Sequence, residues 1–342
     1  MRRVSGRARH GPPALPAWAA LARGVIALAC ALAAAAPAIA VMAGALPDTP
    51  AARVDPNVAS SPYAGVGAVI VDGAPFSGVL IGRRHVLTAA HVVGAAEPSR
   101  IRFRLNAGPQ PALFDAAQVI RHPGFVAFAT PNVHDDLAIV VLAADVPPEV
   151  PVYPLQRAEL PVGTTFVAVG YGGSGQGDGS GRVAADPAVK RVGRNAADRY
   201  VRDDEGGGAQ EVYLFDFDGG GAPNAMGGGT LGNPVETSFA SGDSGAPAFV
   251  AGSTPPRLFG INTFLSAFAG GPTDPGTFGT GGGGMVVAGY AAWIDATVAA
   301  TTPASVGAAD ADAPLPGWLA GVTAAALASV LARTRRHGRA AG

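Results

Sequence analysis

From Tyr63 to about residue 300 the chain consists of short apolar runs that glycine, proline, aspartate and asparagine interrupt, and this pattern most limits the possible folds. Each run has the length of a strand and is too short for an ordinary helix. Many short strands with frequent turn signals are typical of an all-β sandwich or barrel. The predicted strands are Ala68–Val71, Gly78–Ile81, Val86–Ala90, Ile101–Leu105, Leu137–Leu142, Phe166–Val169, Val212–Phe217, Ala248–Val250, Leu258–Ile261 and Met285–Val287.

Helical and loop signals are few in this region. A helix is predicted near Ala291–Ala300, where alanine is frequent and glycine and proline are absent. Three glycine-rich stretches, Gly172–Gly181, Gly219–Gly232 and Gly270–Gly284, are predicted to form long surface loops. The length allows one large domain or two small ones, and no internal repeat is visible.

The first 40 residues have the order of a secretory signal peptide. A basic stretch ends at Arg23, the apolar run Val25–Ala36 follows, and Ala38-Ile39-Ala40 offers a small-residue cleavage site. A transmembrane anchor is the alternative, but the run is shorter than the roughly 20 apolar residues that a span needs. The single cysteine, Cys30, lies in this segment. Cleavage after Ala40 would leave a mature chain without a disulfide or a thiolate site.

The C-terminal residues 314–342 have a three-part pattern. Pro314-Leu315-Pro316 is followed by the apolar stretch Gly317–Ala332 and then by four arginines. This order resembles the C-terminal sorting signals of bacterial envelope proteins, which hold the chain at the membrane before processing. A sorting signal or membrane anchor is therefore predicted, with a helix packed on the domain as the alternative. Residues 41–60 are predicted to be a linker or pro-segment, and residues 301–313 a second linker.

The formal net charge of −1 hides an uneven distribution. Nine of the 24 basic residues lie in residues 1–40 and 333–342, which hold no acid, so the remaining 15 face 25 acids and the middle carries −10. An acidic body disfavours a nucleic-acid partner. The charge pattern instead favours an exported domain between two basic, membrane-addressing ends.

Three short motifs carry candidate chemistry: Val86–Val92 around His91, Asp135–Leu142 around Asp136, and Gly242–Pro247 around Ser244. Each alone is weak, because a histidine after a strand is usually a packed or surface residue and the other two are usual in turns. Together and in this order they resemble the trypsin/chymotrypsin-like serine proteases, over roughly Tyr63 to Ala300. Four flanking segments agree with that resemblance, namely Phe76–Ile81, Val167–Gly172, Leu258–Phe264 and Tyr290–Ile294.

The resemblance implies two six-stranded antiparallel β-barrels with the active site in the cleft, a short C-terminal helix and a protease domain over residues 61–300. It implies that Ser244 is the nucleophile, His91 the general base and Asp136 the residue that holds the base in its tautomer. The backbone amides of Gly242 and Ser244 would form the oxyanion hole. The neighbouring Asp135 is expected to face away from His91, because adjacent strand residues point to opposite sides.

The same resemblance implies which residues meet the substrate. Ser238 would lie at the base of the primary specificity pocket, and Thr263, Phe264 and Leu265 would contact the substrate chain. A neutral base predicts a shallow pocket for small or medium apolar side chains. In this family a cut often releases an amine that pairs with the aspartate before the nucleophile, here Asp243, and Arg53-Val54 offers the only plausible site for that cut.

These features predict a serine endopeptidase acting on protein or peptide substrates through an acyl-enzyme. The expected location is outside the cell or at its surface, and envelope sorting machinery is a possible partner. An inactive binding protein of the same fold and a structural adhesion protein are the alternatives. No cofactor and no metal are expected: the acidic segments 203–205 and 216–218 are predicted to be charged surface loops, not calcium sites, and His122 and His134 to be loop residues.

Overall fold

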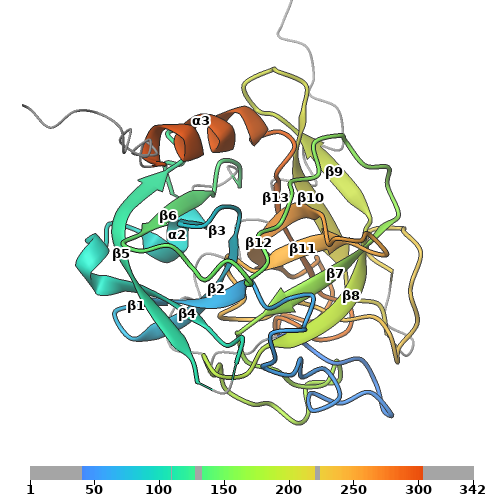
Figure 1. Cartoon of the computed structure of the whole chain (residues 1–342). Coiled ribbons are helices and arrows are strands. Elements are labelled where there is room, and N and C mark those ends of the chain that lie inside the picture. Colours follow the sequence, from blue (N-terminus) through green and yellow to red (C-terminus); the bar gives the residue numbers. More distant parts are fainter. Residues whose placement is uncertain (1–40, 109, 128–132, 220–223, 303–342) are drawn as a thin grey trace, which may run out of the picture. The chain divides into compact units, whose positions relative to one another are not determined.

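The computed structural model describes residues 41–108, 110–127, 133–219 and 224–302. The predicted signal peptide (residues 1–40) and C-terminal sorting segment (residues 314–342) lie outside the described residues. The regular secondary structure of the described chain is mostly β-strand, with a short helix near its end (Figure 1). The all-β fold class is therefore confirmed. Among the described residues, no helix is long and apolar enough to cross a membrane.

The first half of the domain is a closed, antiparallel six-stranded barrel in the order β1-β2-β3-β6-β5-β4. Strands β3 and β6 are buried along their whole lengths. The continuous apolar sequence of β6 agrees with this, whereas β3 also buries His85 and Thr88. A four-residue helix, α2 (Ala90–Val93), and a 3-10 turn, η2 (Pro98–Arg100), separate β3 from β4. The strands are β1 (Val66–Val71), β2 (Ala74–Leu80), β3 (His85–Thr88), β4 (Ile101–Leu105), β5 (Ala112–Arg121) and β6 (Ala138–Leu142).

The second half is an antiparallel sheet of seven strands in the order β8-β7-β11-β12-β13-β10-β9. Only Asp198 separates β8 from β9, and its N–H donates to the Leu214 carbonyl of β10. The continuous stretch β8–β9 therefore pairs with β7 through its first part and with β10 through its second part. This stretch joins the two edges of the sheet. If β8 and β9 are counted as one strand, the second half has the six strands that were predicted. The strands are β7 (Thr164–Gly170), β8 (Arg191–Ala197), β9 (Arg199–Arg202), β10 (Gln210–Asp216), β11 (Pro247–Val250), β12 (Leu258–Ser266) and β13 (Gly281–Val286).

Aromatic packing explains why one glycine-rich stretch is not the loop that its composition predicted. The predicted surface loop Gly270–Gly284 ends inside β13, where four successive glycines are buried. A Cβ at Gly281 or Gly283 would come within 3.0 Å of a neighbouring aromatic ring and still closer to backbone oxygen. The glycines are therefore required by close packing against the aromatic core and not by flexibility.

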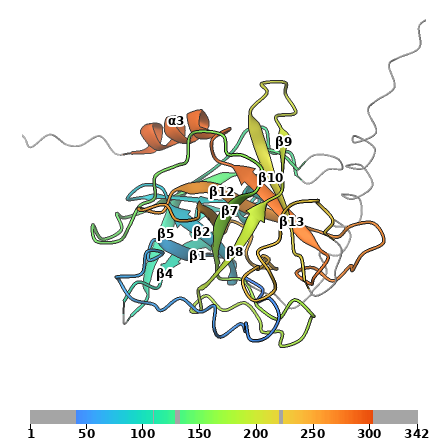
Figure 2. The same ribbon diagram turned by 90° about the vertical axis from the view of Figure 1, so that its right-hand side faces the viewer.

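Strands β5, β8 and β9 were missing from the sequence prediction. β5 alternates only partly, with most of its residues at least partly exposed, and β8 and β9 contain arginines. None of the three forms an apolar run, so they become strands through backbone pairing with neighbours already in place. The helix near the end was predicted nearly in full: α3 spans Ala291–Thr301 and packs against β6. Figure 2 shows α3 at the upper edge of the domain.

Residues 41–60 lie against the second half of the domain. Val41, Met42 and Ala43 are fully buried. The Met42 N–H donates to the Ser238 carbonyl (2.7 Å), and the Ala43 N–H donates to the Gly175 carbonyl (2.8 Å). This segment is thus part of the packed domain from its first described residue.

Candidate active site

His91, Asp136 and Ser244 lie within hydrogen-bond distance of one another. The His91 Nδ1 is 2.6 Å from the Asp136 Oδ2, and the His91 Nε2 is 2.8 Å from the Ser244 Oγ. The His91 backbone N–H also donates to the Asp136 Oδ1 (2.8 Å). Asp136 is fully buried and His91 keeps 24% of its side-chain surface exposed. One histidine thus joins a buried carboxylate to a partly buried hydroxyl.

Strand pairing places the first two of these residues side by side. His91 follows β3 in α2, Asp136 precedes β6, and β3 pairs with β6 through Thr88 and Ala138. Asp135 points elsewhere, as predicted, but for a different reason. It lies before the strand with a left-handed φ of 64°, and its Oδ1 is 3.0 Å from the Nδ1 of His122. A backbone turn, and not strand alternation, therefore selects Asp136.

The turn that carries Ser244 depends on two glycines. Gly242 and Gly245 have φ values of 90° and 83°, which favour glycine. A Cβ on Gly245 would lie under 3.0 Å from the Ser77 carbonyl and the Thr88 hydroxyl. The turn therefore presses directly against β2 and β3 of the first barrel, and this contact brings Ser244 to His91.

Ser77 of β2 orients the peptide groups around the nucleophile. Its N–H donates to the Ser244 carbonyl (3.0 Å) and its hydroxyl to the Gly242 carbonyl (3.4 Å). Both carbonyls are thus held by the first barrel. Within the described part of the chain, the N–H groups of Gly242 and Ser244 donate to no protein acceptor. Two unengaged N–H groups beside a hydroxyl can bind a developing oxyanion.

In the sequence, Ser77 is one residue of the segment Phe76–Ile81, and nothing in that segment distinguishes it. Its own carbonyl accepts from the Thr88 hydroxyl (2.8 Å), and its Oγ accepts from the Tyr171 N–H (3.0 Å). A serine in a strand carries no local signal for such a role. Only the approach of the two halves reveals it.

Asp243 is a second buried carboxylate, directly before Ser244. It accepts from the N–H groups of Gly172 and Ala240, at 3.0 Å each. Burial raises the pKa of Asp243 to about 8, against the opposing effects of those two hydrogen bonds and of the charge on Arg191. The two hydrogen bonds and the charge on Arg191 therefore do not fully offset the cost of burying the Asp243 carboxylate.

The residues predicted to meet substrate lie on two neighbouring segments. Ser238 is buried, and its hydroxyl donates to the Phe239 carbonyl (3.1 Å). Thr263, Phe264 and Leu265 belong to β12, directly after Asn262. Asn262 exchanges backbone hydrogen bonds with the nucleophile turn: its carbonyl accepts from Gly245 and its N–H donates to Ala246. β12 is therefore hydrogen-bonded to the turn that carries Ser244, and Thr263, Phe264 and Leu265 follow that point of contact.

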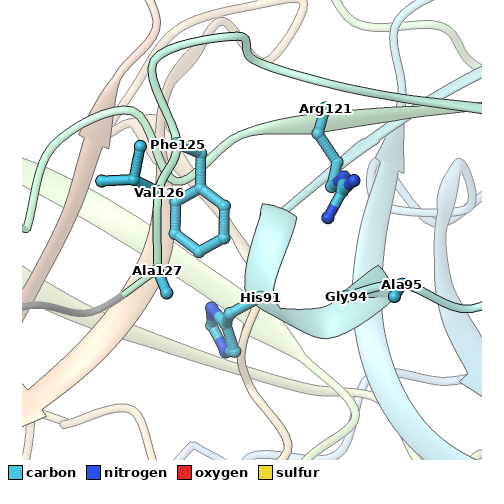
Figure 3. A pocket seen from close by; sticks show the side chains of 7 residues that line it. All are labelled: His91, Gly94, Ala95, Arg121, Phe125, Val126 and Ala127. Carbon is cyan, nitrogen blue, oxygen red and sulfur yellow. The ribbon is translucent and has the colours of Figure 1, made fainter.

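A hollow of about 400 Å³ opens beside His91 and was not predicted. Figure 3 shows Phe125 and Ala127 on the side of the hollow nearest the His91 ring, Val126 pointing away from that ring, and Arg121 across from them. Gly94 and Ala95 complete its lining. The hollow therefore combines apolar side chains and one cation beside His91.

Other predicted features differ in detail. His85 starts β3, and its Nε2 lies 2.9 Å from the Thr301 hydroxyl. His122 and His134 are outside strands, as predicted, yet both are paired with carboxylates. The prediction of a charged surface loop at residues 216–218 was wrong, because Asp216 and Asp218 are buried. Burial and the nearby Asp216 and Glu236 raise the pKa of Asp218 to about 6.

Comparison with known families agrees with this geometry. The family model described as Trypsin matches residues 67–294, about two thirds of the chain, and includes all three residues of the hydrogen-bonded set. A search of curated proteins finds no match.

Proposed function

Because the chain belongs to the trypsin family of serine proteases, we propose that it is an exported endopeptidase that uses His91, Asp136 and Ser244. The observation that carries this proposal is the continuous hydrogen-bonded path from the Asp136 carboxylate through His91 to the Ser244 hydroxyl. Inactive relatives of a protease would be free to lose this alignment. The complete set favours catalysis over the alternative of a surface binding protein.

The proposed reaction begins when the Ser244 Oγ attacks the scissile carbonyl carbon and the His91 Nε2 accepts the hydroxyl proton. Asp136 stabilises the resulting imidazolium through its 2.6 Å contact with Nδ1. The negative oxygen of the tetrahedral intermediate faces the N–H groups of Gly242 and Ser244. His91 then protonates the leaving amine, and the C–N bond breaks to leave an acyl ester on Ser244. Water, deprotonated by His91, hydrolyses the ester and restores the enzyme.

We propose a preference for small or medium apolar side chains before the cleaved bond. Ser238 supplies no charge at the predicted pocket base, and a lysine or arginine side chain would require a buried carboxylate there. Leu265, half-buried on β12, stands where a glycine would leave the pocket open. A panel of chromogenic peptides tests this preference, and fastest turnover after arginine would reject it.

We also propose that signal peptidase cleaves after Ala40 and that Val41 is the first residue of the active enzyme. Val41 is fully buried, and its carbonyl accepts from the Ser174 hydroxyl (2.8 Å). Met42 bonds to Ser238 on the other side. Val41 therefore lies between segments 172–174 and 238–240.

The carboxylate of Asp243 lies between the same two segments, through its bonds to Gly172 and Ala240. The α-ammonium group of Val41 would supply a positive charge to this buried carboxylate. The alternative cut at Arg53-Val54 is disfavoured, because Val54 is 44% exposed and its N–H bonds to the Ala51 carbonyl upstream of that cut. N-terminal sequencing of active protein distinguishes the two, and a start at Val54 would reject the proposal.

The C-terminal segment 314–342 is proposed to hold the exported protein at the membrane until sorting machinery removes it. Mass spectrometry of protein from the producing cells would test this. A mature form that still contains the four terminal arginines would contradict removal.

A serine-directed phosphonate tests the central proposal. Labelling of the processed protein on Ser244, lost in Ser244→Ala, is the expected result. A folded and processed protein that the phosphonate does not label would favour the binding-protein alternative.

A further inference from the structure

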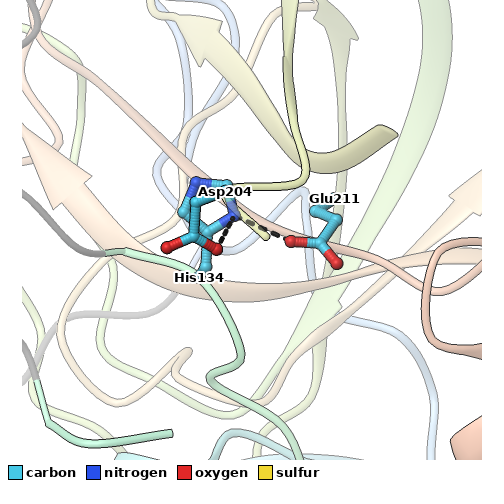
Figure 4. Close-up of side chains that lie close together, drawn as sticks. All are labelled: His134, Asp204 and Glu211. Carbon is cyan, nitrogen blue, oxygen red and sulfur yellow. Dashed lines mark hydrogen bonds and ion pairs between the residues drawn. The ribbon is translucent and has the colours of Figure 1, made fainter. Parts of the chain in front are cut away.

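Three metal-binding side chains meet outside the catalytic set. His134, Asp204 and Glu211 each place one nitrogen or oxygen atom within 4.8 Å of the others (Figure 4). The His134 Nδ1 is 2.9 Å from the Glu211 Oε2 and 3.6 Å from the Asp204 Oδ1. His134 and Glu211 are more than nine-tenths buried, whereas the Asp204 side chain is 44% exposed. The cluster therefore has a buried floor and one side open to solvent.

We propose that this cluster binds a divalent transition-metal ion, with Zn²⁺ as the representative. Zinc bonds of about 2.0–2.1 Å to nitrogen and oxygen at tetrahedral angles place neighbouring ligand atoms about 3.3 Å apart. The two measured distances from the His134 Nδ1 lie on either side of that value. Small movements of two carboxylates would complete three protein ligands.

The donor set selects the class of ion. A buried imidazole nitrogen with two carboxylates suits zinc and its neighbours, whereas calcium and magnesium prefer oxygen ligands alone. A fourth position would face solvent on the Asp204 side, where water can complete the coordination. Asp135 and Glu205, which directly follow His134 and Asp204 in the chain, add negative charge nearby. This charge favours a cation of 2+ over one of 1+.

A metal-free arrangement is the competing explanation. A protonated His134 could pair with both carboxylates. Burial lowers the pKa of His134, but the hydrogen bond that His134 donates to Glu211 and the charges of Asp204, Glu211 and Asp135 raise it overall. The two explanations differ in what the His134 Nδ1 carries, a proton in one and a metal ion in the other. A measurement of metal binding distinguishes them, whereas the distances alone do not.

The position of the cluster gives the ion a structural task. His134 is two residues before Asp136 in the first half, while Asp204 and Glu211 belong to the β9–β10 hairpin of the second half. The neighbouring Asp135 N–H already donates to the Tyr290 hydroxyl (3.0 Å). A bound ion would add a second contact between the two halves and would fix residues 134 and 135, which directly precede Asp136. His134 is thus a positioning residue, distinct from the catalytic set.

The test uses the processed protein with Ser244→Ala, which prevents self-digestion and makes the result independent of the proposed proteolysis. Zn²⁺ titration by calorimetry should show one equivalent bound, and saturation should raise the unfolding midpoint by about 5 °C. Co²⁺ should give the visible absorption of a four-coordinate site.

Asp204→Asn is the ligand variant, chosen because its exposed side chain is not needed for folding, and it should weaken Zn²⁺ binding about tenfold or more. Glu205→Gln is the matched control, since it removes the same charge from the next exposed residue and should change the affinity less than threefold. Absence of stoichiometric binding would overturn the proposal in favour of a plain ion pair. Equal loss in both variants would also overturn it, because it would indicate attraction by general charge alone.

Discussion

The substitution Asp136→Asn tests the proposed role of the buried carboxylate most directly. Asp136 accepts two hydrogen bonds from one residue, the backbone N–H of His91 at Oδ1 and the ring at Oδ2. An asparagine side chain has only one oxygen. That oxygen should keep the hydrogen bond from the His91 backbone N–H, because the reverse orientation would place the NH₂ group against this N–H, donor against donor. Its NH₂ group would then face the His91 Nδ1.

An NH₂ group at that position requires Nδ1 to be an acceptor, so the ring proton moves to Nε2. His91 would then donate to Ser244 and could not accept its proton. Loss of the correct tautomer is expected to lower kcat about 10⁴-fold, which corresponds to about 5.4 kcal/mol of transition-state stabilisation. The fold should persist, because the substitution keeps the shape of the side chain and one of its two hydrogen bonds.

The rate constant of phosphonate labelling of Ser244 measures this loss without knowledge of the natural substrate. Asp135→Asn is the matched control, since it makes the same chemical change one residue earlier on a carboxylate that pairs with His122. The control should label within tenfold of the parent protein. A folded Asp136→Asn variant that also labels within tenfold would refute the assignment of Asp136.

Three further predictions concern the surroundings of the site. Asp243→Asn removes the proposed partner of the Val41 amine, so activity should fall at least about tenfold while sequencing still finds Val41 first, and full activity would exclude that pairing. Gly245→Ala would place a Cβ against Ser77 at a φ of 83°, and urea unfolding should detect a loss of about 3 kcal/mol; an unchanged midpoint would contradict this packing. Burial raises the pKa of Asp198 to about 7, so native stability should decline as pH rises from about 4 to 7. The free energy of unfolding of the Asp198→Asn variant should therefore exceed that of the parent by about 2 kcal/mol at pH 8 but by little at pH 4. An equal difference at both pH values would contradict the raised pKa of Asp198.

The strands and motifs that could be predicted share one property: their signal lies in neighbouring residues. The run Leu137–Leu142 and the helix near Ala291–Ala300 were predicted because apolar periodicity is local. β8 contains Arg191 and Arg194 and therefore has no apolar run. It forms through backbone pairing with β7. The glycines of β13 gave a false loop signal, since composition does not distinguish flexibility from tight packing.

Burial was the least predictable property of the charged residues. Asp216 and Asp218 were assigned to the surface by their charge, yet both lie inside the domain. The proposed metal-binding cluster could not be predicted for a different reason: His134 and Glu211 are 77 positions apart, and no local spacing joins them. Residues 41–43, predicted to be a linker or pro-segment, are also buried.

The sequence by itself determined the β-rich fold class, the order of the three motifs and the candidates His91, Asp136 and Ser244, because strands, turns and motif spacing are written in adjacent residues. The tertiary structure alone decided which groups meet. His91 reaches across 45 positions to Asp136 and 153 positions to Ser244, and Ser77 holds the nucleophile turn from the other barrel. Such contacts depend on the packing of distant strands, and that packing is set by the whole core and not by any one segment.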